Sequence, residues 1–261
     1  MIVWKEESMS VETCVIVAGA AGFLGNALVR AAEAAPEVSR VLAVTRRPDV
    51  RGLEGSDVRG GIDLADPNGI AVLREAIEGL DEPRIALIHC VGNFPRLAPL
   101  HRTSLEDFTR TIDSNLTTFV GVMQAVVPAM RRRRWGRLLA FSAHARAENY
   151  PFMGSFNVAK AALEAAVQTA ANENARYGIA VNAISIATLN TEVEKELKPT
   201  GSFSDWLEPA DVAGFALDLA LSGPIHLNGS IVHYWHHSDS FFGESAFARN
   251  SIDRDTLDPE E

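Results

Sequence analysis

The sequence contains little cysteine, with only Cys14 and Cys90 in 261 residues. A framework of several disulfides is therefore excluded, and because both cysteines lie in apolar, strand-like runs we expect buried free thiols. No apolar run reaches the roughly 20 residues that are needed to span a bilayer. The start, Met1–Glu7, carries early acidic residues and no signal-peptide core. These absences predict a cytoplasmic protein.

Positive charge is also scarce, because the chain has 24 Lys and Arg residues but 34 Asp and Glu residues, which gives a net charge of -10. Proteins that bind nucleic acid or anionic membranes in general need a basic surface, so neither partner is expected. A Gly-x-Ser-x-Gly elbow is missing, which argues against a hydrolase of that type. Tyrosine occurs three times, at Tyr150, Tyr177 and Tyr234, so few phenols are available for catalysis.

The chain is 47% hydrophobic, and its apolar segments alternate between strand-like and helix-like patterns. This alternation predicts one doubly wound α/β domain over residues 1–248, with a central parallel sheet covered by helices on both faces. The acidic tail, residues 249–261, is predicted to be disordered. The expected strands are Thr13–Ala18, Val41–Thr45, Val58–Ile62, Ile85–Val91, Arg137–Ser142, Ala180–Ser185 and Ser230–Tyr234. The expected helices are Gly22–Ala35, Asn68–Leu80, Leu105–Arg132, Met153–Tyr177 and Pro209–Ser222.

A glycine-rich turn stands between the first expected strand and the first expected helix. Glycines at this place allow a tight turn and a close approach of the backbone to phosphate, while the helix N-terminus faces a pyrophosphate. Because the motif follows the first strand and opens the first helix, it predicts a Rossmann-like dinucleotide site. The residues expected there are Gly19, Ala21, Gly22, Phe23, Leu24 and Gly25.

In NAD(H)-binding sites an acidic residue at the end of the second strand bonds the adenosine ribose. This chain instead carries Arg46 and Arg47 at the end of the second expected strand. Guanidinium groups pair bidentately with phosphate, so these arginines favour NADP(H) over NAD(H). A solvated basic turn would carry the same residues. Asp63, after the third strand, is placed to accept a hydrogen bond from the adenine amino group, although a helix cap would look similar.

The segment Gly154–Leu163 reads as the start of an alanine-rich helix, and it places Phe156 four residues before Lys160. Residues at this spacing share one helical face. In a hydride-transfer enzyme the pair would be Tyr and Lys, because a phenol moves the proton and a cation lowers the pKa of the phenol. Phenylalanine keeps the ring and lacks the proton.

These features together resemble the short-chain dehydrogenase/reductase family over about residues 11–234. The resemblance implies adenine contacts at Asp63 and Leu64, and a cofactor-site glycine at Gly92. It also implies nicotinamide contacts at Thr188 and Thr191. The segments that carry it are Ala18–Gly25, Asp63–Leu64, His89–Gly92, Ser114–Leu116, Val127–Met130, Trp135–Arg137 and Val181–Ser185. Two segments depart from the family, because only the glycine of its Asn-Asn-Ala-Gly motif is kept and Ile186-Ala187 replace its usual Pro-Gly.

The family resemblance implies four catalytic residues, Asn, Ser, Tyr and Lys. Asn115 and Lys160 match directly, and Lys160 is also expected to bond the nicotinamide ribose. Phe156 occupies the tyrosine position, and the serine position falls on Ala143, with Ser142 adjacent. A shift of one residue reverses the direction of a strand side chain, so Ser142 is one alternative and loss of the serine is the other.

Three residues before the long helix offer other proton donors. Tyr150, His144 and Glu148 lie on the segment that leads to Phe156, and histidine titrates near neutrality. Substrate binding or loop structure is the competing interpretation of each. The histidines near the C-terminus lack acids or cysteines at ligand spacing, so no metal site is expected. The run Arg131–Arg134 is interpreted as a solvated helix end, with an anion site as the alternative.

Two functions follow. The first is an NADP(H)-dependent oxidoreductase without the usual tyrosine, acting on a small imine, iminium or activated carbonyl. The second is a non-redox protein with a retained dinucleotide site, either a lyase, isomerase or cyclase or a cofactor-binding regulator. The alanine-rich faces of Leu105–Arg132 and Met153–Tyr177 permit close helix packing, and with the family resemblance they predict a homodimer or homotetramer.

Overall fold

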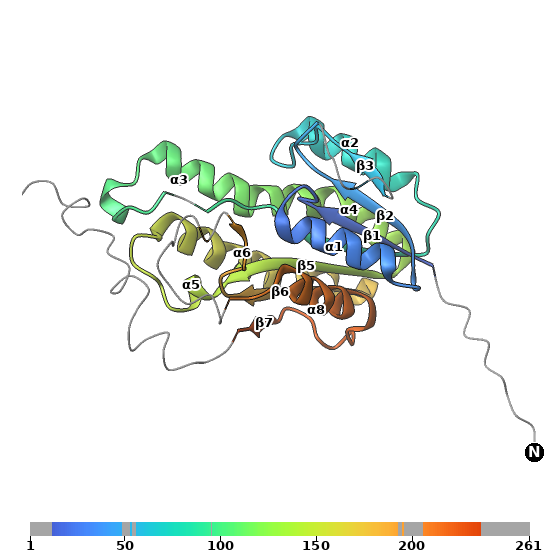
Figure 1. The fold of residues 1–261 in the computed structure, drawn as a ribbon. Helices are drawn as coiled ribbons and strands as arrows, with labels where there is room; N and C mark the ends of the chain where they lie inside the picture. The colour runs from blue at the N-terminus through green and yellow to red at the C-terminus, as the bar shows by residue number, and fades with distance from the viewer. Residues whose placement is uncertain are drawn as a thin grey trace, which may run out of the picture.

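The computed structural model describes residues 12–48, 53, 56–94, 96–192, 195 and 206–235. In this part of the chain seven strands form one parallel sheet, in the order β3-β2-β1-β4-β5-β6-β7 (Figure 1). The predicted α/β class is confirmed, and each expected strand is present with shifts of a few residues at its ends. The strands are β1 (Thr13–Ala18), β2 (Val38–Val44), β3 (Asp57–Arg59), β4 (Arg84–His89), β5 (Gly136–Ala143), β6 (Ile179–Ile186) and β7 (Ile231–Tyr234).

Helices cover both faces of the sheet, as continuous apolar strands require. On one face lie α1 (Phe23–Ala34) and α8 (Pro209–Ser222), drawn in front of the strands in Figure 1. The other face packs against α2 (Pro67–Glu78), α4 (Thr118–Arg133) and α6 (Gly154–Asn174). Successive side chains of a strand point to opposite faces of the sheet. Ile16 therefore packs on the face covered by α2, α4 and α6, and Val15 on the face covered by α1 and α8.

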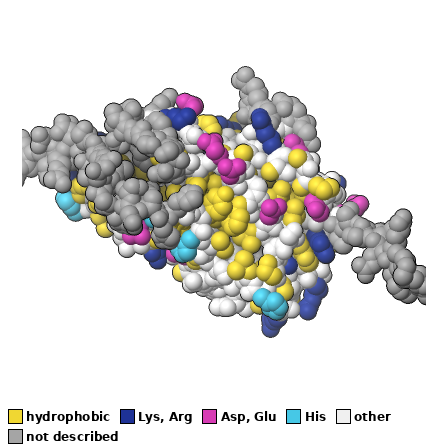
Figure 2. Space-filling model, turned by 60° about the horizontal axis from the view of Figure 1, so that its bottom comes forward, with side chains coloured by type: hydrophobic (Ala, Val, Ile, Leu, Met, Phe, Trp, Pro, Cys, Tyr) yellow, Lys and Arg dark blue, Asp and Glu magenta, His cyan; other side chains and the backbone are white. Residues whose placement is uncertain are grey.

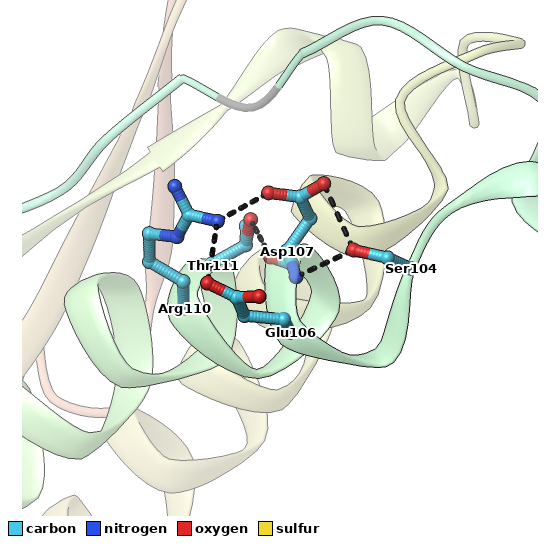
Figure 3. Close-up of polar contacts among 5 residues, drawn as sticks. All are labelled: Ser104, Glu106, Asp107, Arg110 and Thr111. Carbon is cyan, nitrogen blue, oxygen red and sulfur yellow. Dashed lines mark hydrogen bonds and ion pairs between the residues drawn. The ribbon is translucent and has the colours of Figure 1, made fainter.

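The helix α3 (Leu105–Ile112) begins at a capped turn (Figure 3). The Oγ of Ser104 accepts a hydrogen bond from the backbone N–H of Asp107 at 3.1 Å, which satisfies one of the unpaired donors of the first turn. Arg110 then pairs with Glu106 and Asp107 on the exposed surface, while the Thr111 hydroxyl donates to the Asp107 carbonyl at 2.8 Å. This cap fixes where the helix starts and hence which residues face the sheet further along.

A π-helical turn, η2 (Asp113–Thr117), joins α3 to α4. The uninterrupted helix that was expected over Leu105–Arg132 is therefore one helical run with a widened turn in its middle. An extra residue in a turn shifts side chains relative to the ordinary helical ladder, and such turns occur frequently at functional sites. Here the widened turn contains Asn115, which is buried.

Because all the strands are parallel, their C-terminal ends meet at one edge of the sheet, where ligands of open α/β folds bind. The segments that follow β1, β2, β3, β4 and β6 carry residues predicted to contact the cofactor, and the segment after β5 carries candidate proton donors. One short helix, α5 (His144–Ala147), occurs where only a loop was expected. The predicted tail at residues 249–261 lies outside the described residues.

None of the helices in the described ranges is long and apolar enough to cross a membrane. The face turned forward in Figure 2 carries hydrophobic side chains in its middle, with acidic and basic side chains scattered around them. Both cysteines are free thiols, with Cys14 buried and Cys90 partly exposed.

Candidate active site

The glycine-rich turn after β1 has the shape of a phosphate cradle. Gly19 has φ +91°, which L side chains rarely adopt, and a Cβ on Gly25 would lie 2.2 Å from the Gly19 carbonyl oxygen. The N–H groups of Gly19 and Ala20 both donate to the Val44 carbonyl, which ties the turn to β2. Gly22 caps α1 without a side-chain hydrogen bond, and the first turn contains no acid. The N-terminus of α1 is thus suited to an anion.

The arginines after β2 point into a more open region. Arg46 is exposed, and its Nη1 lies 3.9 Å from Oδ2 of the half-exposed Asp63. Oδ1 of Asp63 accepts the Ala65 N–H at 2.9 Å, so one carboxylate oxygen holds the local turn. The Arg47 N–H donates to the Thr45 hydroxyl at 3.1 Å. The side chains of Arg46 and Asp63 therefore lie near each other, and this exposed pair is weak.

Phe156 and Lys160 do share one face of α6. The Lys160 ammonium lies 5.4 Å from the centroid of the Phe156 ring and donates to the Phe141 carbonyl at 2.7 Å. Lys160 is only 6% exposed. Burial lowers the pKa of its ammonium to about 8, because desolvation penalises the charge. On its other side the Phe156 ring meets the Phe94 ring at 5.7 Å.

Asn115 and Gly92 meet Lys160 at the same place. Nδ2 of Asn115 donates to the Thr111 carbonyl at 3.0 Å and to the Asn93 carbonyl at 3.2 Å. Its Oδ1 is buried and has no hydrogen-bond partner among the residues that the structure describes. A Cβ on Gly92 would lie 2.6 Å from that oxygen and 3.9 Å from Lys160 Nζ. A larger residue at position 92 would therefore have to displace the Asn115 amide, and a buried acceptor stands beside a buried cation.

Comparison with known proteins identifies the family of the chain. A family model described as enoyl-(acyl carrier protein) reductase matches residues 31–219, which is well over half of the chain. The chain belongs to the short-chain dehydrogenase/reductase family. A short-chain type dehydrogenase/reductase from Mycobacterium ulcerans has the same fold, with a TM-score of 0.73 and 22% identity over 85% of this chain and 87% of that chain.

Two other members of the short-chain dehydrogenase/reductase family are similar in sequence. The 2,3-dihydroxy-2,3-dihydro-p-cumate dehydrogenase of Pseudomonas putida is 30% identical over 52% of this chain, and the chain spans about half of that relative, 52% of its length. The acetoacetyl-CoA reductase of Paracoccus denitrificans is 28% identical over 69% of this chain and 77% of its own length. A Beutenbergia cavernae protein described as an NAD(P)-dependent gluconate 5-dehydrogenase, solved with bound NADP at low occupancy, has a TM-score of 0.72 at 21% identity over 85% of this chain and 94% of that chain.

Ser142, the possible substitute for the family's serine, is engaged elsewhere. Its hydroxyl donates to Oε1 of Glu164 at 2.6 Å, and Oε2 of Glu164 lies 3.4 Å from Nε of Arg146. Glu164 follows Lys160 by one turn of α6, on the side of the sheet where Ala140 packs. Ala143, at the serine position itself, is the next residue of β5 and so faces the other side. The Ser142 hydroxyl thus stabilises the junction of β5, α5 and α6.

His144 and Tyr150 lie next to each other in the segment between β5 and α6. The Tyr150 hydroxyl is 3.4 Å from Nδ1 of His144, whose ring also packs on Trp235 with centroids 4.6 Å apart. Burial, and next the charge of Glu148, raise the pKa of the Tyr150 phenol above its usual range. The phenol is therefore protonated at neutral pH.

The threonines after β6 lie on a segment that is tied to the start of α8. The Thr188 carbonyl accepts the Leu207 N–H at 2.9 Å, and the Thr191 N–H donates to the Leu189 carbonyl at 3.0 Å. Thr191 is buried and Thr188 is half-buried. Their contact with a cofactor stays a prediction, as does that of Leu64, whose side chain is buried in the core.

Three features of the site escaped sequence reasoning. Glu164 was not singled out, although it lies four residues after Lys160 and so on the same helical face. Phe94 gave no signal, because its pairing with Phe156 joins distant segments. His89 replaces an asparagine of the family motif and bonds the Thr118 hydroxyl at 3.0 Å. Burial, and next the charge of Lys160, lower the pKa of His89 to about 3, so it is neutral.

Proposed function

We propose that this protein is an NADP(H)-dependent oxidoreductase that reduces a small imine, iminium or activated carbonyl without the usual tyrosine acid. The observation that carries the proposal is the combination of a complete glycine cradle with Asn115 and Lys160 around a phenylalanine. The cradle and α1 would hold the pyrophosphate, Arg46 and Arg47 the 2′-phosphate, and Lys160 the nicotinamide ribose. When bound, the cofactor supplies a hydride.

The substrate class follows from the missing phenol. An iminium cation that receives a hydride becomes a neutral amine, and it needs no proton from the protein. Phe156 presents a half-buried apolar ring beside Phe94, which suits a substrate with a flat apolar part. The names of two relatives, a 2,3-dihydroxy-2,3-dihydro-p-cumate dehydrogenase and an acetoacetyl-CoA reductase, support an oxidoreductase.

The direct test is consumption of NADPH against a panel of iminium ions, cyclic imines, activated diketones and simple ketones. We expect turnover of the first three classes and little of the fourth. Consumption of NADPH with none of them, in protein that binds the cofactor, would contradict the proposal.

A non-redox function is the second candidate, and one observation favours it. Phe156 and Ala143 both lack the hydroxyls of the family's catalytic positions, and the neighbouring Ser142 hydroxyl is bonded to Glu164. A lyase, isomerase or cyclase would keep the pocket, and a regulator would keep the dinucleotide site. Binding of NADP(H) without its consumption by any substrate supports this candidate.

Cofactor choice is predicted to depend on Arg46 and Arg47. Replacing both by alanine removes the guanidinium contacts to a 2′-phosphate, each worth roughly 1.5–3 kcal/mol, so we expect more than about tenfold weaker NADP(H) binding. NAD(H) has no such phosphate, and its affinity should change far less. Fluorescence titration with both cofactors measures the difference, and Arg74→Ala on α2 is a matched surface control. Equal losses for the two cofactors would refute the assignment.

A homodimer or homotetramer is proposed to form through α4 and α6. Val120 on α4 and Val158 on α6 are 39% and 44% exposed, so each helix presents an apolar side chain outside the core. We expect light scattering at micromolar concentration to give the mass of two or four chains. Val158→Glu should shift the mass toward one chain, whereas Val72→Glu on α2, at a side chain that is 50% exposed, should not. A monomeric unaltered protein would contradict the proposal.

A further inference from the structure

Three titratable side chains between β5 and α6 are linked end to end. The Tyr150 hydroxyl lies 3.4 Å from Nδ1 of His144, and Nε2 of His144 lies 4.0 Å from Oε1 of Glu148. His144 is 5% exposed, so its imidazole is largely shielded from water. The short helix α5 creates the link, because the N–H of Glu148 donates to the His144 carbonyl and brings the carboxylate back over the ring. A phenol, an imidazole and a carboxylate therefore stand in sequence.

In the sequence these three residues lie between Ala143 and Phe156, the two positions where the hydroxyl of the family's catalytic residue is missing. His144 directly follows Ala143, the serine position. Nδ2 of Asn157, the residue after Phe156, donates to the Tyr150 carbonyl at 2.9 Å. The backbone of Tyr150 is thus anchored to the turn of α6 that carries the phenylalanine.

The backbone around Tyr150 is held in unusual conformations. Asn149 has φ 50° and Phe152 has φ 64°, both in the left-handed region. Asparagine adopts it readily, whereas a phenylalanine there is strained and persists only where surrounding contacts impose it. The Phe152 carbonyl accepts the Ala98 N–H at 3.0 Å, which supplies one such contact. Strain of this kind tends to cluster at active sites.

We infer that Tyr150, His144 and Glu148 form a proton relay that replaces the family's tyrosine when the substrate is an activated carbonyl. The inference rests on the proposed function and specifies how that site delivers a proton. Tyr150 is the acid that touches the substrate oxygen, His144 resupplies the phenol, and Glu148 is a positioning residue for the imidazole.

The geometry suits a protonated imidazole, which alone donates from both nitrogens. In the relay the imidazolium pairs through Nε2 with the Glu148 carboxylate across 4.0 Å and donates its Nδ1–H to the phenol oxygen, which leaves the phenol proton for the substrate. As the carbonyl carbon gains the hydride, the electron pair of the C=O π bond moves to oxygen, and that oxygen takes the Tyr150 proton to give an alcohol. The phenolate then takes the Nδ1 proton of His144, and a proton from solvent returns to the imidazole by way of the Glu148 carboxylate, whose side chain is 35% exposed.

Two probes separate proton delivery from hydride delivery. Phenylpropanedione, an activated diketone, needs a proton, whereas an N-methyl dihydroisoquinolinium cation needs only a hydride. We expect Tyr150→Phe to lower the ratio of diketone to iminium turnover by about 10²-fold, as loss of a general acid does. Glu148→Gln should lower the ratio by about 10-fold, and Glu148→Asp should restore part of it, as for groups that orient a reacting residue. Tyr177→Phe, at the far end of α6, is the matched control.

The possible outcomes separate the relay from the proposed function. An unchanged ratio in Tyr150→Phe overturns the relay and leaves the oxidoreductase in place. Reduction of the iminium alone by the unaltered protein does the same, because no protein acid then operates. Consumption of NADPH with neither probe overturns the oxidoreductase and the relay together.

A second measurement needs neither cofactor nor substrate. The protein has three tyrosines, so the NMR signal of Tyr150 in isotope-labelled tyrosine rings is identified by its loss in Tyr150→Phe. Glu148→Gln should lower the pH at which Tyr150 ionises, because the carboxylate charge is one cause of the raised pKa of this phenol. His144→Phe should shift the Tyr150 signal at neutral pH by removing its neighbour. A signal that responds to neither change contradicts the relay.

Discussion

Phe156→Tyr combined with Ala143→Ser is expected to create or raise the reduction of simple ketones by about 10²–10⁴-fold, the contribution of a well-placed general acid. The Lys160 ammonium already lies 5.4 Å from the ring that would carry the new hydroxyl. A cation at this distance favours the phenolate and so lowers the pKa of a phenol, which makes it a better acid. Asn115 is also in place. The unaltered protein should show little activity toward simple ketones and alcohols.

The measurement is NADPH consumption with a simple aryl ketone. Phe94→Tyr is the matched control, because it adds a phenol to the neighbouring ring, whose centroid lies 5.7 Å from that of Phe156. The single variants separate the two hydroxyls, and we expect Phe156→Tyr to give most of the gain. A double variant that binds NADPH and gains nothing would mean that a carbonyl is not held at this place, which favours the non-redox candidate.

Reduction of simple ketones by the unaltered protein would point to a different proton donor. Strong ketone reduction that vanishes in Tyr150→Phe would contradict the expectation and extend the relay to simple ketones. Loss in His144→Ala alone would assign the acid to the imidazole. If neither change matters and no substrate consumes NADPH, the non-redox function is the better explanation.

Local patterns were sufficient to predict the fold because short-range chemistry decides it. The continuous apolar run Thr13–Ala18 is buried at every position, as a central parallel strand must be. The glycines after it were identifiable because their spacing expresses a steric need, and the structure places Gly25 against the Gly19 carbonyl. Lys160 was placed correctly by helical periodicity alone.

The catalytic side chains were harder to predict, because their roles depend on contacts between distant segments. No periodicity indicates that the Ser142 hydroxyl bonds Glu164, or that Phe94 lies against Phe156. The π-helical turn at Asn115 has no composition signal, since its residues are ordinary helix residues. The same holds for α5, whose single turn is too short for a hydrophobic period but brings Glu148 back to His144.

Lys160→Met is expected to stabilise the cofactor-free protein while weakening its cofactor binding. Burial lowers the pKa of Lys160 to about 8 from 10.5, so the unfolded chain binds the proton more tightly than the folded one. Such a shift corresponds to about 3 kcal/mol of instability, present in full below the folded pKa. Losing the hydrogen bond to the Phe141 carbonyl costs about 1 kcal/mol, so we expect a net gain of about 2 kcal/mol at neutral pH.

The pH dependence of the free energy of unfolding is a second test of the buried Lys160 charge. Between pH 8 and 10.5 the unfolded chain binds more protons than the folded one, so the free energy of unfolding contributed by Lys160 rises with pH across that window. Denaturant unfolding at several pH values should show this rise in the unaltered protein and its loss in Lys160→Met. The half-buried Lys195, paired with Glu192 at 3.0 Å, supplies the control Lys195→Met, which should keep it.

Cofactor binding should move in the opposite direction. If the Lys160 ammonium bonds the nicotinamide ribose, its loss removes charge-assisted hydrogen bonds worth roughly 1.5–3 kcal/mol, so NADPH affinity should fall by more than about tenfold. Fluorescence titration measures this in the same samples. A variant that is less stable and binds NADPH normally would contradict both expectations. The Lys160 ammonium would then stabilise the folded protein and take no part in cofactor binding. Opposite shifts in stability and affinity would instead identify Lys160 as a charge retained for the ligand at the expense of the fold.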